Sequence, residues 1–167
     1  MPLLIMNLAS LTGHLHLSPG FEWIGSHYSS VAFGTATLVE VLAYYIPWLD
    51  HVLDLIASPA AIIAGVIATA SVMMDISPFL RWTLAIIAGG GAAAIVQGAT
   101  VALRAKSSAL TAGAGNVFVS SAELAGSIMT ALLAIAVPVL CLILISLLCI
   151  FAIWKAGRFF FGRTKIK

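Results

Sequence analysis

Two glutamates, Glu40 and Glu123, lie inside long apolar stretches of the sequence. An acidic side chain within a membrane-spanning helix is costly, so it is a candidate functional group by default. Glu40 lies in a predicted helix that ends at residue 46, six residues further on. Glu123 lies in one that begins at residue 117, six residues earlier. Both therefore lie about 9 Å inside the same membrane boundary and could face one another. Such a pair could carry protons or bind a cation; alternatively, each glutamate only holds neighbouring helices together.

A further predicted helix contains three unusual features: a glycine triplet around Gly90, the polar Gln97, and Arg104 near the end. Consecutive glycines allow either close helix contact or an unwound stretch that lines a cavity. Gln97 is polar at mid-depth, so it needs a hydrogen-bonding partner or a pore. Arg104 either extends to the lipid headgroups or pairs with Glu123 or Glu40. We count all of these residues as candidates for a transport path.

A polar cluster of Asp50, His51 and Asp54 lies on one face of the amphipathic segment 48–57. Positions three and four apart converge on a helix, and such nitrogen and oxygen groups can bind a divalent ion. Three ligands on one exposed turn do not make a closed site. We therefore predict a solvated face or a contact at the cytoplasmic mouth of a pathway, and no metal site.

No catalytic motif is visible: the sequence has no G-x-S-x-G, no H-E-x-x-H and no P-loop. Cys141 and Cys149 lie in the most apolar stretch and are interpreted as small hydrophobic residues. We expect neither an enzyme nor a cofactor.

The composition indicates which elements must position these residues. Hydrophobic residues make up 62% of the 167 residues and charged residues only 8%, whereas a soluble domain carries roughly a quarter charged residues. This excludes a soluble globule, and a net charge of +2 gives no basic stripe for nucleic acid. A spanning helix needs about 20 apolar residues. The predicted spans cover residues 3–17, 29–46, 59–74, 82–103, 117–136 and 139–157, with Pro138 as the hinge between the last two.

These spans form one polytopic all-α transmembrane domain over residues 1–157, followed by a basic tail at 158–167. If the C-terminus is cytoplasmic, seven of the eight basic residues lie inside and only Arg81 lies outside. This distribution follows the positive-inside rule. With six spans, both termini are predicted to be cytoplasmic.

Five segments have a distinctive sequence and order: PGFEWIGS (19–26), LVE (38–40), IPWLDHVLDLI (46–56), SP (58–59) and SAEL (121–124). Together they resemble the bacterial membrane protein family named DUF4126. The resemblance implies an inner-membrane protein with this helical architecture. It implies little about chemistry, because the family is uncharacterised.

The two halves of the chain can be drawn as an inverted 3+3 repeat, an arrangement typical of secondary transporters. The two intramembrane glutamates lead us to predict a small transporter or channel for an ion or small solute, with proton coupling through Glu40 and Glu123. The alternative is a membrane scaffold or lipid-binding protein in which the same acids only lock helices together. The expected partners are membrane lipids, a small solute or ion, and a second copy of the chain in a homodimer.

Overall fold

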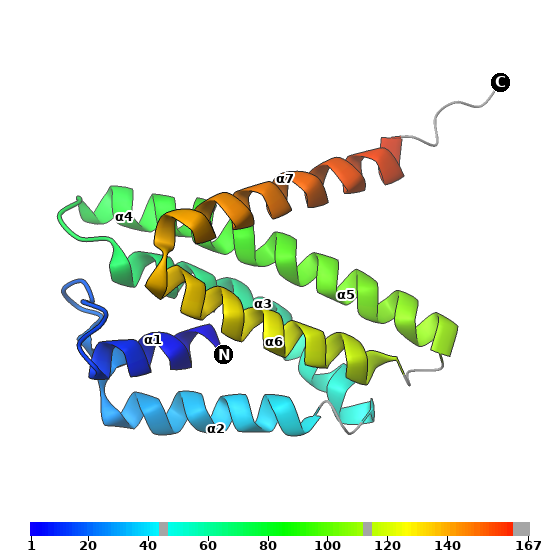
Figure 1. Ribbon diagram of the computed structural model, residues 1–167, viewed down its shortest axis with the longest axis horizontal. Coiled ribbons are helices and arrows are strands. Elements are labelled where there is room, and N and C mark those ends of the chain that lie inside the picture. Colours follow the sequence, from blue (N-terminus) through cyan, green and yellow to red (C-terminus); the bar gives the residue numbers. More distant parts are fainter. Residues whose placement is uncertain (44–46, 112–114, 162–167) are drawn as a thin grey trace.

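The apolar runs fold into helices that cross the molecule back and forth in a computed structural model (Figure 1). The structure describes residues 1–43, 47–111 and 115–161, and only the backbone for residues 47–54, 156 and 159–161. The helices are α1 (Pro2–Leu11), the 3-10 helix η1 (Glu22–Gly25), α2 (His27–Ala43), α3 (Pro47–Val72), α4 (Pro78–Leu84), the π-helical segment η2 (Ala85–Gly90), α5 (Gly91–Thr111), α6 (Asn116–Ala136) and α7 (Pro138–Phe161).

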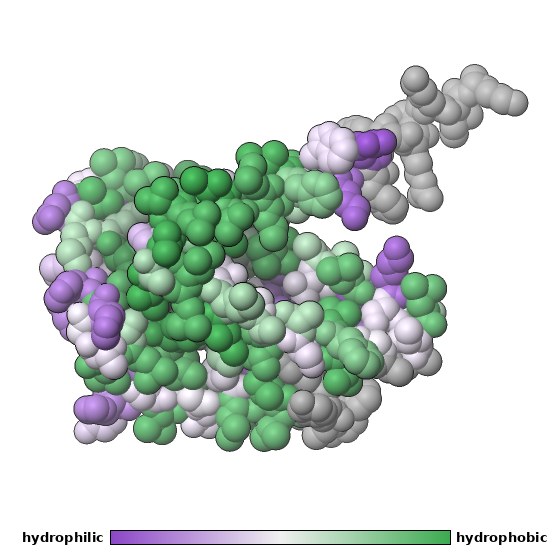
Figure 2. All heavy atoms as spheres, in the orientation of Figure 1, coloured by the Kyte–Doolittle hydropathy of each residue, from purple (hydrophilic) through white to green (hydrophobic). Residues whose placement is uncertain are grey.

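The fold is all-α and polytopic, as the sequence predicts, and the described part of the chain contains no strand. Four helical stretches are long and apolar enough to cross a membrane: Leu55–Val72, Pro78–Thr111, Asn116–Ala136 and Pro138–Lys155. Helix α1, with 10 residues, and α2, with 17, are shorter. Together with the four long stretches they make six segments, which is compatible with the predicted number, but α1 alone, at about 15 Å, reaches only half-way through a 30 Å hydrocarbon core. Hydrophobic side chains cover the middle of the visible face, and hydrophilic ones gather toward its ends (Figure 2). The apolar helices indicate a membrane-embedded protein.

Helix α1 ends at Leu11, whereas the sequence predicts a span that continues to residue 17. Gly13 has φ +74°, a conformation that glycine adopts without the steric cost of a Cβ atom. The Gly13 amide donates to the Ser10 carbonyl at 3.1 Å and the His14 amide to the Ala9 carbonyl at 2.8 Å. This is a Schellman motif, which satisfies the last helical carbonyls and stops the helix.

The segment that follows α1 packs across one end of the bundle. Asn7 on α1 is fully buried and donates to the carbonyls of Ile24 at 2.6 Å and Ser26 at 2.9 Å. The Ser18 hydroxyl donates to the Ala70 carbonyl at 3.1 Å, near the end of α3. Phe21 and Ile24 are buried beside Ala70 and Ala85 in a small core. The PGFEWIGS segment is thus a packed closure of this end.

Helix α3 is continuous from Pro47 to Val72 and contains Pro59 in its interior. The sequence predicts a boundary here, with Ser58 as the N-cap of a new span and 48–57 as a separate interfacial helix. In the structure the Ser58 hydroxyl accepts a hydrogen bond from Gln97 on α5, at 3.3 Å. Ser58 therefore connects two helices, and the interfacial segment is the first part of a longer helix.

The predicted span at 82–103 is longer in the structure, because α4, η2 and α5 run without a break for 34 residues. At 1.5 Å per residue they extend about 50 Å, so this helix must tilt or project beyond a 30 Å hydrocarbon core. The glycine triplet does not unwind; Gly89 and Gly90 belong to η2. A Cβ atom at Gly65 on α3 would lie 2.7 Å from the Gly89 carbonyl oxygen. Glycine is needed on both helices for this contact.

The chain turns sharply between its last two helices. Helix α6 ends at Ala136 and α7 begins at Pro138, where the sequence predicts the hinge. Cys141 and Cys149 are both free thiols; Cys141 is buried and donates to the Thr130 carbonyl at 3.6 Å.

Candidate functional site

Helices α5 and α6 form a hairpin, and its two charged partners lie equally far from the turn. Arg104 lies seven residues before Thr111, the end of α5, and Glu123 lies seven residues after Asn116, the start of α6. In an antiparallel pair, residues equally far from the turn lie side by side. Both charges are therefore about 10 Å from the end of the hairpin, within the stretches long enough to cross a membrane.

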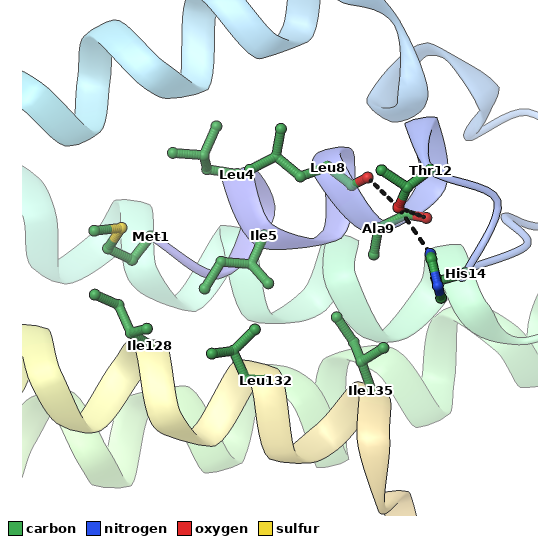
Figure 3. A pocket seen from close by; sticks show the side chains of 10 residues that line it. All are labelled: Met1, Leu4, Ile5, Leu8, Ala9, Thr12, His14, Ile128, Leu132 and Ile135. Carbon is green, nitrogen blue, oxygen red and sulfur yellow. Dashed lines mark hydrogen bonds between the residues drawn. The ribbon is translucent and has the colours of Figure 1, made fainter.

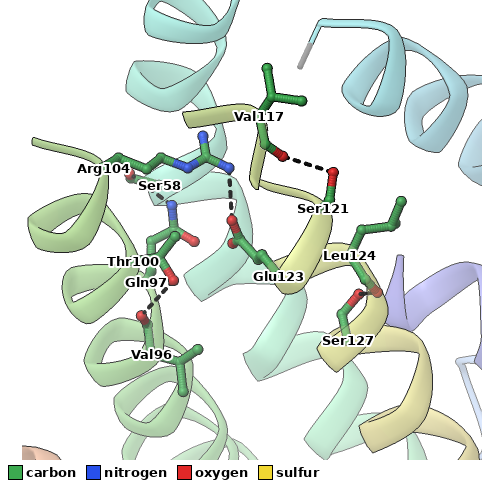
Figure 4. Close-up of polar contacts among 10 residues, drawn as sticks. All are labelled: Ser58, Val96, Gln97, Thr100, Arg104, Val117, Ser121, Glu123, Leu124 and Ser127. Atoms are coloured by element: carbon green, nitrogen blue, oxygen red, sulfur yellow. Dashed lines mark hydrogen bonds and ion pairs between the residues drawn. The ribbon is translucent and has the colours of Figure 1, made fainter. Parts of the chain in front are cut away.

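Arg104 and Glu123 form an ion pair. The Arg104 Nη2 atom donates to Glu123 Oε2 at 2.7 Å (Figure 4). The side chains are 8% and 29% exposed, respectively, so the guanidinium is the more deeply buried partner. A charge-assisted hydrogen bond of this length is among the stronger polar contacts in proteins. Of the two partners suggested for Arg104 by the sequence, the structure shows the contact with Glu123.

Asn116 and Ser120 continue the polar face of α6 toward the turn. Asn116 is 7% exposed and donates to the Ser108 hydroxyl on α5 at 2.9 Å. Ser120 is fully buried, and it lies one turn from both Asn116 and Glu123. Neither Asn116 Oδ1 nor Ser120 Oγ has a hydrogen-bond partner within the described structure. We call Arg104, Ser108, Asn116, Ser120 and Glu123 the polar seam.

Two buried polar atoms without a partner are a notable feature of this seam. Each such atom costs about 1–3 kcal/mol relative to the hydrogen-bonded state. A water molecule or a polar ligand that bonds to Asn116 Oδ1 and Ser120 Oγ would recover this free energy. The polar seam is therefore suited to bind a small polar species next to an ion pair.

Gln97 lies two turns before Arg104 on α5 and extends the polar contacts to α3. Its Nε2 atom donates to the Ser58 hydroxyl at 3.3 Å (Figure 4). The sequence indicates that Gln97 needs a partner or a pore, and the structure supplies a partner. The polar contacts thus join three helices: α3, α5 and α6.

Glu40 and Gly90 lie in other surroundings. The Glu40 carboxylate is 45% exposed and lies 3.8 Å from the amino group of Met1. Gly90 is buried in η2, where an added Cβ would lie 2.9 Å from Val66 Cγ2. It is about 20 Å along the helix from Arg104. Gly90 therefore belongs to the contact with α3 and not to the polar seam.

The cluster of Asp50, His51 and Asp54 lies in the first turns of α3, where only the backbone is described. The predicted convergence of these side chains is thus outside the described residues. Among the side chains that the structure does describe, no group of three His, Cys, Asp or Glu is placed to hold a metal ion.

Sequence reasoning finds Glu123 and Arg104 and points to Ser120 as a hydroxyl neighbour of Glu123, but it misses Asn116. The available signal is the spacing of Asn116, Ser120 and Glu123, at i, i+4 and i+7, which places three polar residues on one helix face. Small polar residues are easily overlooked in an apolar helix, because serine is tolerated at helix contacts without a functional role.

Comparison with known proteins gives one result. The family model described as "Domain of unknown function (DUF4126)" matches residues 1–158, nearly the whole chain. No curated protein and no solved structure matches. The resemblance carried by PGFEWIGS and IPWLDHVLDLI is therefore confirmed: the chain belongs to the DUF4126 family.

Proposed function

We propose that this protein is an inner-membrane transporter or channel for a small ion or polar solute, and that the polar seam is the place where this species binds. The observation that carries the proposal is the ion pair of Arg104 and Glu123 beside two buried polar atoms that lack partners. Purely structural packing in an apolar bundle is served better by apolar side chains, since a buried ion pair is weak evidence for stability.

Glu123 is the group that we expect to exchange protons or cations. Its side chain is 29% exposed, whereas that of Arg104 is 8% exposed, so Glu123 is the partner that a mobile ion can approach more easily. A cation bound at Glu123 would compete with Arg104 for the same oxygen atoms. This competition provides a simple means of coupling: the guanidinium is released when the cation binds and recovers its partner when the cation leaves.

The flux of protons and alkali cations tests this proposal. The full chain is reconstituted in liposomes that contain either a pH-sensitive or a sodium-sensitive dye, and a potassium diffusion potential drives the ions. We expect flux that depends on pH, and at least a tenfold loss in Glu123→Gln, because glutamine cannot titrate. Glu40→Gln shows whether the second carboxylate contributes, and we expect a smaller loss because Glu40 is more exposed.

The matched control is Glu22→Gln. Glu22 lies in η1 and accepts a hydrogen bond from the Gly20 amide at 2.8 Å, a contact that glutamine can retain. Flux should be unchanged in this variant. If Glu123→Gln folds normally and conducts like the unaltered chain, or if no tested ion or polar solute crosses, the transport proposal fails.

The orientation that we propose places the C-terminus in the cytoplasm. Four of the five basic residues with described side chains, namely Arg104, Lys106, Lys155 and Arg158, belong to the end of the bundle at which α5 and α7 finish, and Arg81 belongs to the opposite end. We expect a C-terminal fluorescent reporter that folds only in the cytoplasm to be active, and a C-terminal alkaline phosphatase to be inactive. The reverse pattern contradicts this orientation.

A membrane scaffold is the second candidate function, and the contact between α3 and η2 favours it. Gly65 and Gly89 bring two backbones together more closely than any other residue type allows, which is typical of proteins that depend on rigid helix packing. For a scaffold, the ion pair only fastens α5 to α6. Replacement of both charges by apolar residues, described in the Discussion, distinguishes the two functions.

A further inference from the structure

An apolar groove runs between α1 and α6, away from the polar seam. Its volume is about 430 Å³, and of its ten lining residues only Thr12 and His14 are polar. Ile5 on α1 faces Ile128 and Leu132 on α6 across the groove (Figure 3). We propose that this groove binds one acyl chain of a bilayer phospholipid, a role that is independent of the proposed transport.

The length of the groove matches one leaflet of a membrane. It follows α1, whose 10 residues extend about 15 Å. Half of a 30 Å hydrocarbon core is also about 15 Å. Because α1 begins beside Ile128 in the middle of α6 and ends at the closure formed by residues 12–26, the groove covers the leaflet on the side of that closure.

The volume of the groove suits one acyl chain better than a helix. A hydrocarbon chain about 4.5 Å across and 15 Å long occupies roughly 250 Å³, taking the contact distance of neighbouring carbon atoms as its width. A helix about 10 Å in diameter occupies roughly 1,200 Å³ over the same length. With about 430 Å³, the groove has room for a single chain and is too small to enclose a helix.

The two polar residues lie together at one end of the groove, where the headgroup of such a lipid would be. The Thr12 hydroxyl donates to the Leu8 carbonyl at 2.9 Å, and His14 Nδ1 lies 3.0 Å from Thr12 Oγ1. Both residues are exposed. The groove surface itself is apolar along the path of the chain, and these two exposed polar side chains lie where the headgroup of a lipid would leave the groove.

The test is lipid retention. The full chain is purified in a mild maltoside detergent, and bound lipid is identified by native mass spectrometry and by extraction. We expect about one phospholipid per chain. In Ile128→Trp the indole fills the groove, and retention should fall at least fivefold. Leu132→Phe, a smaller change at the next turn, provides a second variant in case Ile128→Trp does not fold.

The matched control is Met129→Trp on the same helix. Met129 is 71% exposed and does not line the groove, so this variant should retain lipid like the unaltered chain. The proposal is overturned if the unaltered chain retains no phospholipid or only a free fatty acid. It is equally overturned if folded groove-filling variants retain as much as Met129→Trp, or if filling the groove converts a dimer to a monomer.

Discussion

Glu123→Leu should destabilise the protein by about 3 kcal/mol, the lower end of the range for removing one partner of a buried ion pair. The variant deprives Arg104 of the carboxylate to which it donates at 2.7 Å, and the Arg104 side chain, only 8% exposed, lies between helices. The value lies at the lower end because the Glu123 side chain is 29% exposed, so water already solvates part of the pair. Unfolding in mixed detergent micelles, followed by circular dichroism, measures the change.

The double variant Arg104→Met, Glu123→Leu should recover most of this loss, since no charge is then left in the seam and both new side chains pack well in apolar surroundings. Its ion flux separates the two candidate functions. A stable double variant without flux supports transport through the polar seam. If Glu123→Leu is as stable as the unaltered chain, the ion pair does not hold α5 against α6, and the structural account of this pair is wrong.

Alanine at Gly89 should destabilise the protein by about 1–3 kcal/mol, the usual cost of overpacking a well-packed contact. The added Cβ would meet the Gly65 carbonyl oxygen and the Thr69 side chain on α3. The Gly65 oxygen belongs to the backbone, so it cannot move aside without shifting the helix. Gly90→Ala should cost less, because there the nearest atom, Val66 Cγ2, belongs to a side chain.

Gly91→Ala is the matched control, two residues further along the same helix. An added Cβ at Gly91 meets no atom within 4 Å, and alanine favours a helix over glycine by roughly 1 kcal/mol. This variant should therefore be neutral or slightly stabilising. If Gly89→Ala and Gly91→Ala change the stability equally, the contact between α3 and η2 does not require glycine at position 89, and the geometric argument is wrong.

The sequence predicts the end of a helix correctly where one residue type alone determines the backbone conformation. Pro138 marks the turn between α6 and α7 because proline cannot continue an i to i−4 hydrogen bond. Gly13 gave a similar signal for the end of α1, through its preference for positive φ, but the apolar residues around it favoured a longer span. Pro59 is a counterexample, since α3 contains this proline and continues past it. Whether a proline stops a helix is therefore not decided by local sequence alone, because neighbouring helices and local backbone adjustments can satisfy the groups that the proline leaves free.

The sequence predicts which charged residues belong to the candidate site, but not which of them contact one another. Charged residues are scarce in the apolar runs, and this identifies Glu123 and Glu40. Their equal depth below one membrane boundary suggests that the two side chains face each other. Depth leaves the rotation of each helix undetermined, and rotation decides which side chains touch. The structure brings Glu123 to Arg104 and places Glu40 beside the Met1 amino group. The unsatisfied atoms of Asn116 and Ser120 depend on packing across the hairpin, which no local pattern encodes.

The equal distance of Arg104 and Glu123 from the turn of their hairpin also bears on biogenesis. A lone arginine at the centre of a spanning helix costs about 2.5–3.5 kcal/mol on insertion scales, and an acidic residue is similarly disfavoured. If α5 and α6 leave the translocon together, the two charges enter the lipid at the same moment and the same depth, already neutralised by one another. The register of this hairpin thus favours insertion of the two helices as one unit, in which the charges of Arg104 and Glu123 neutralise one another.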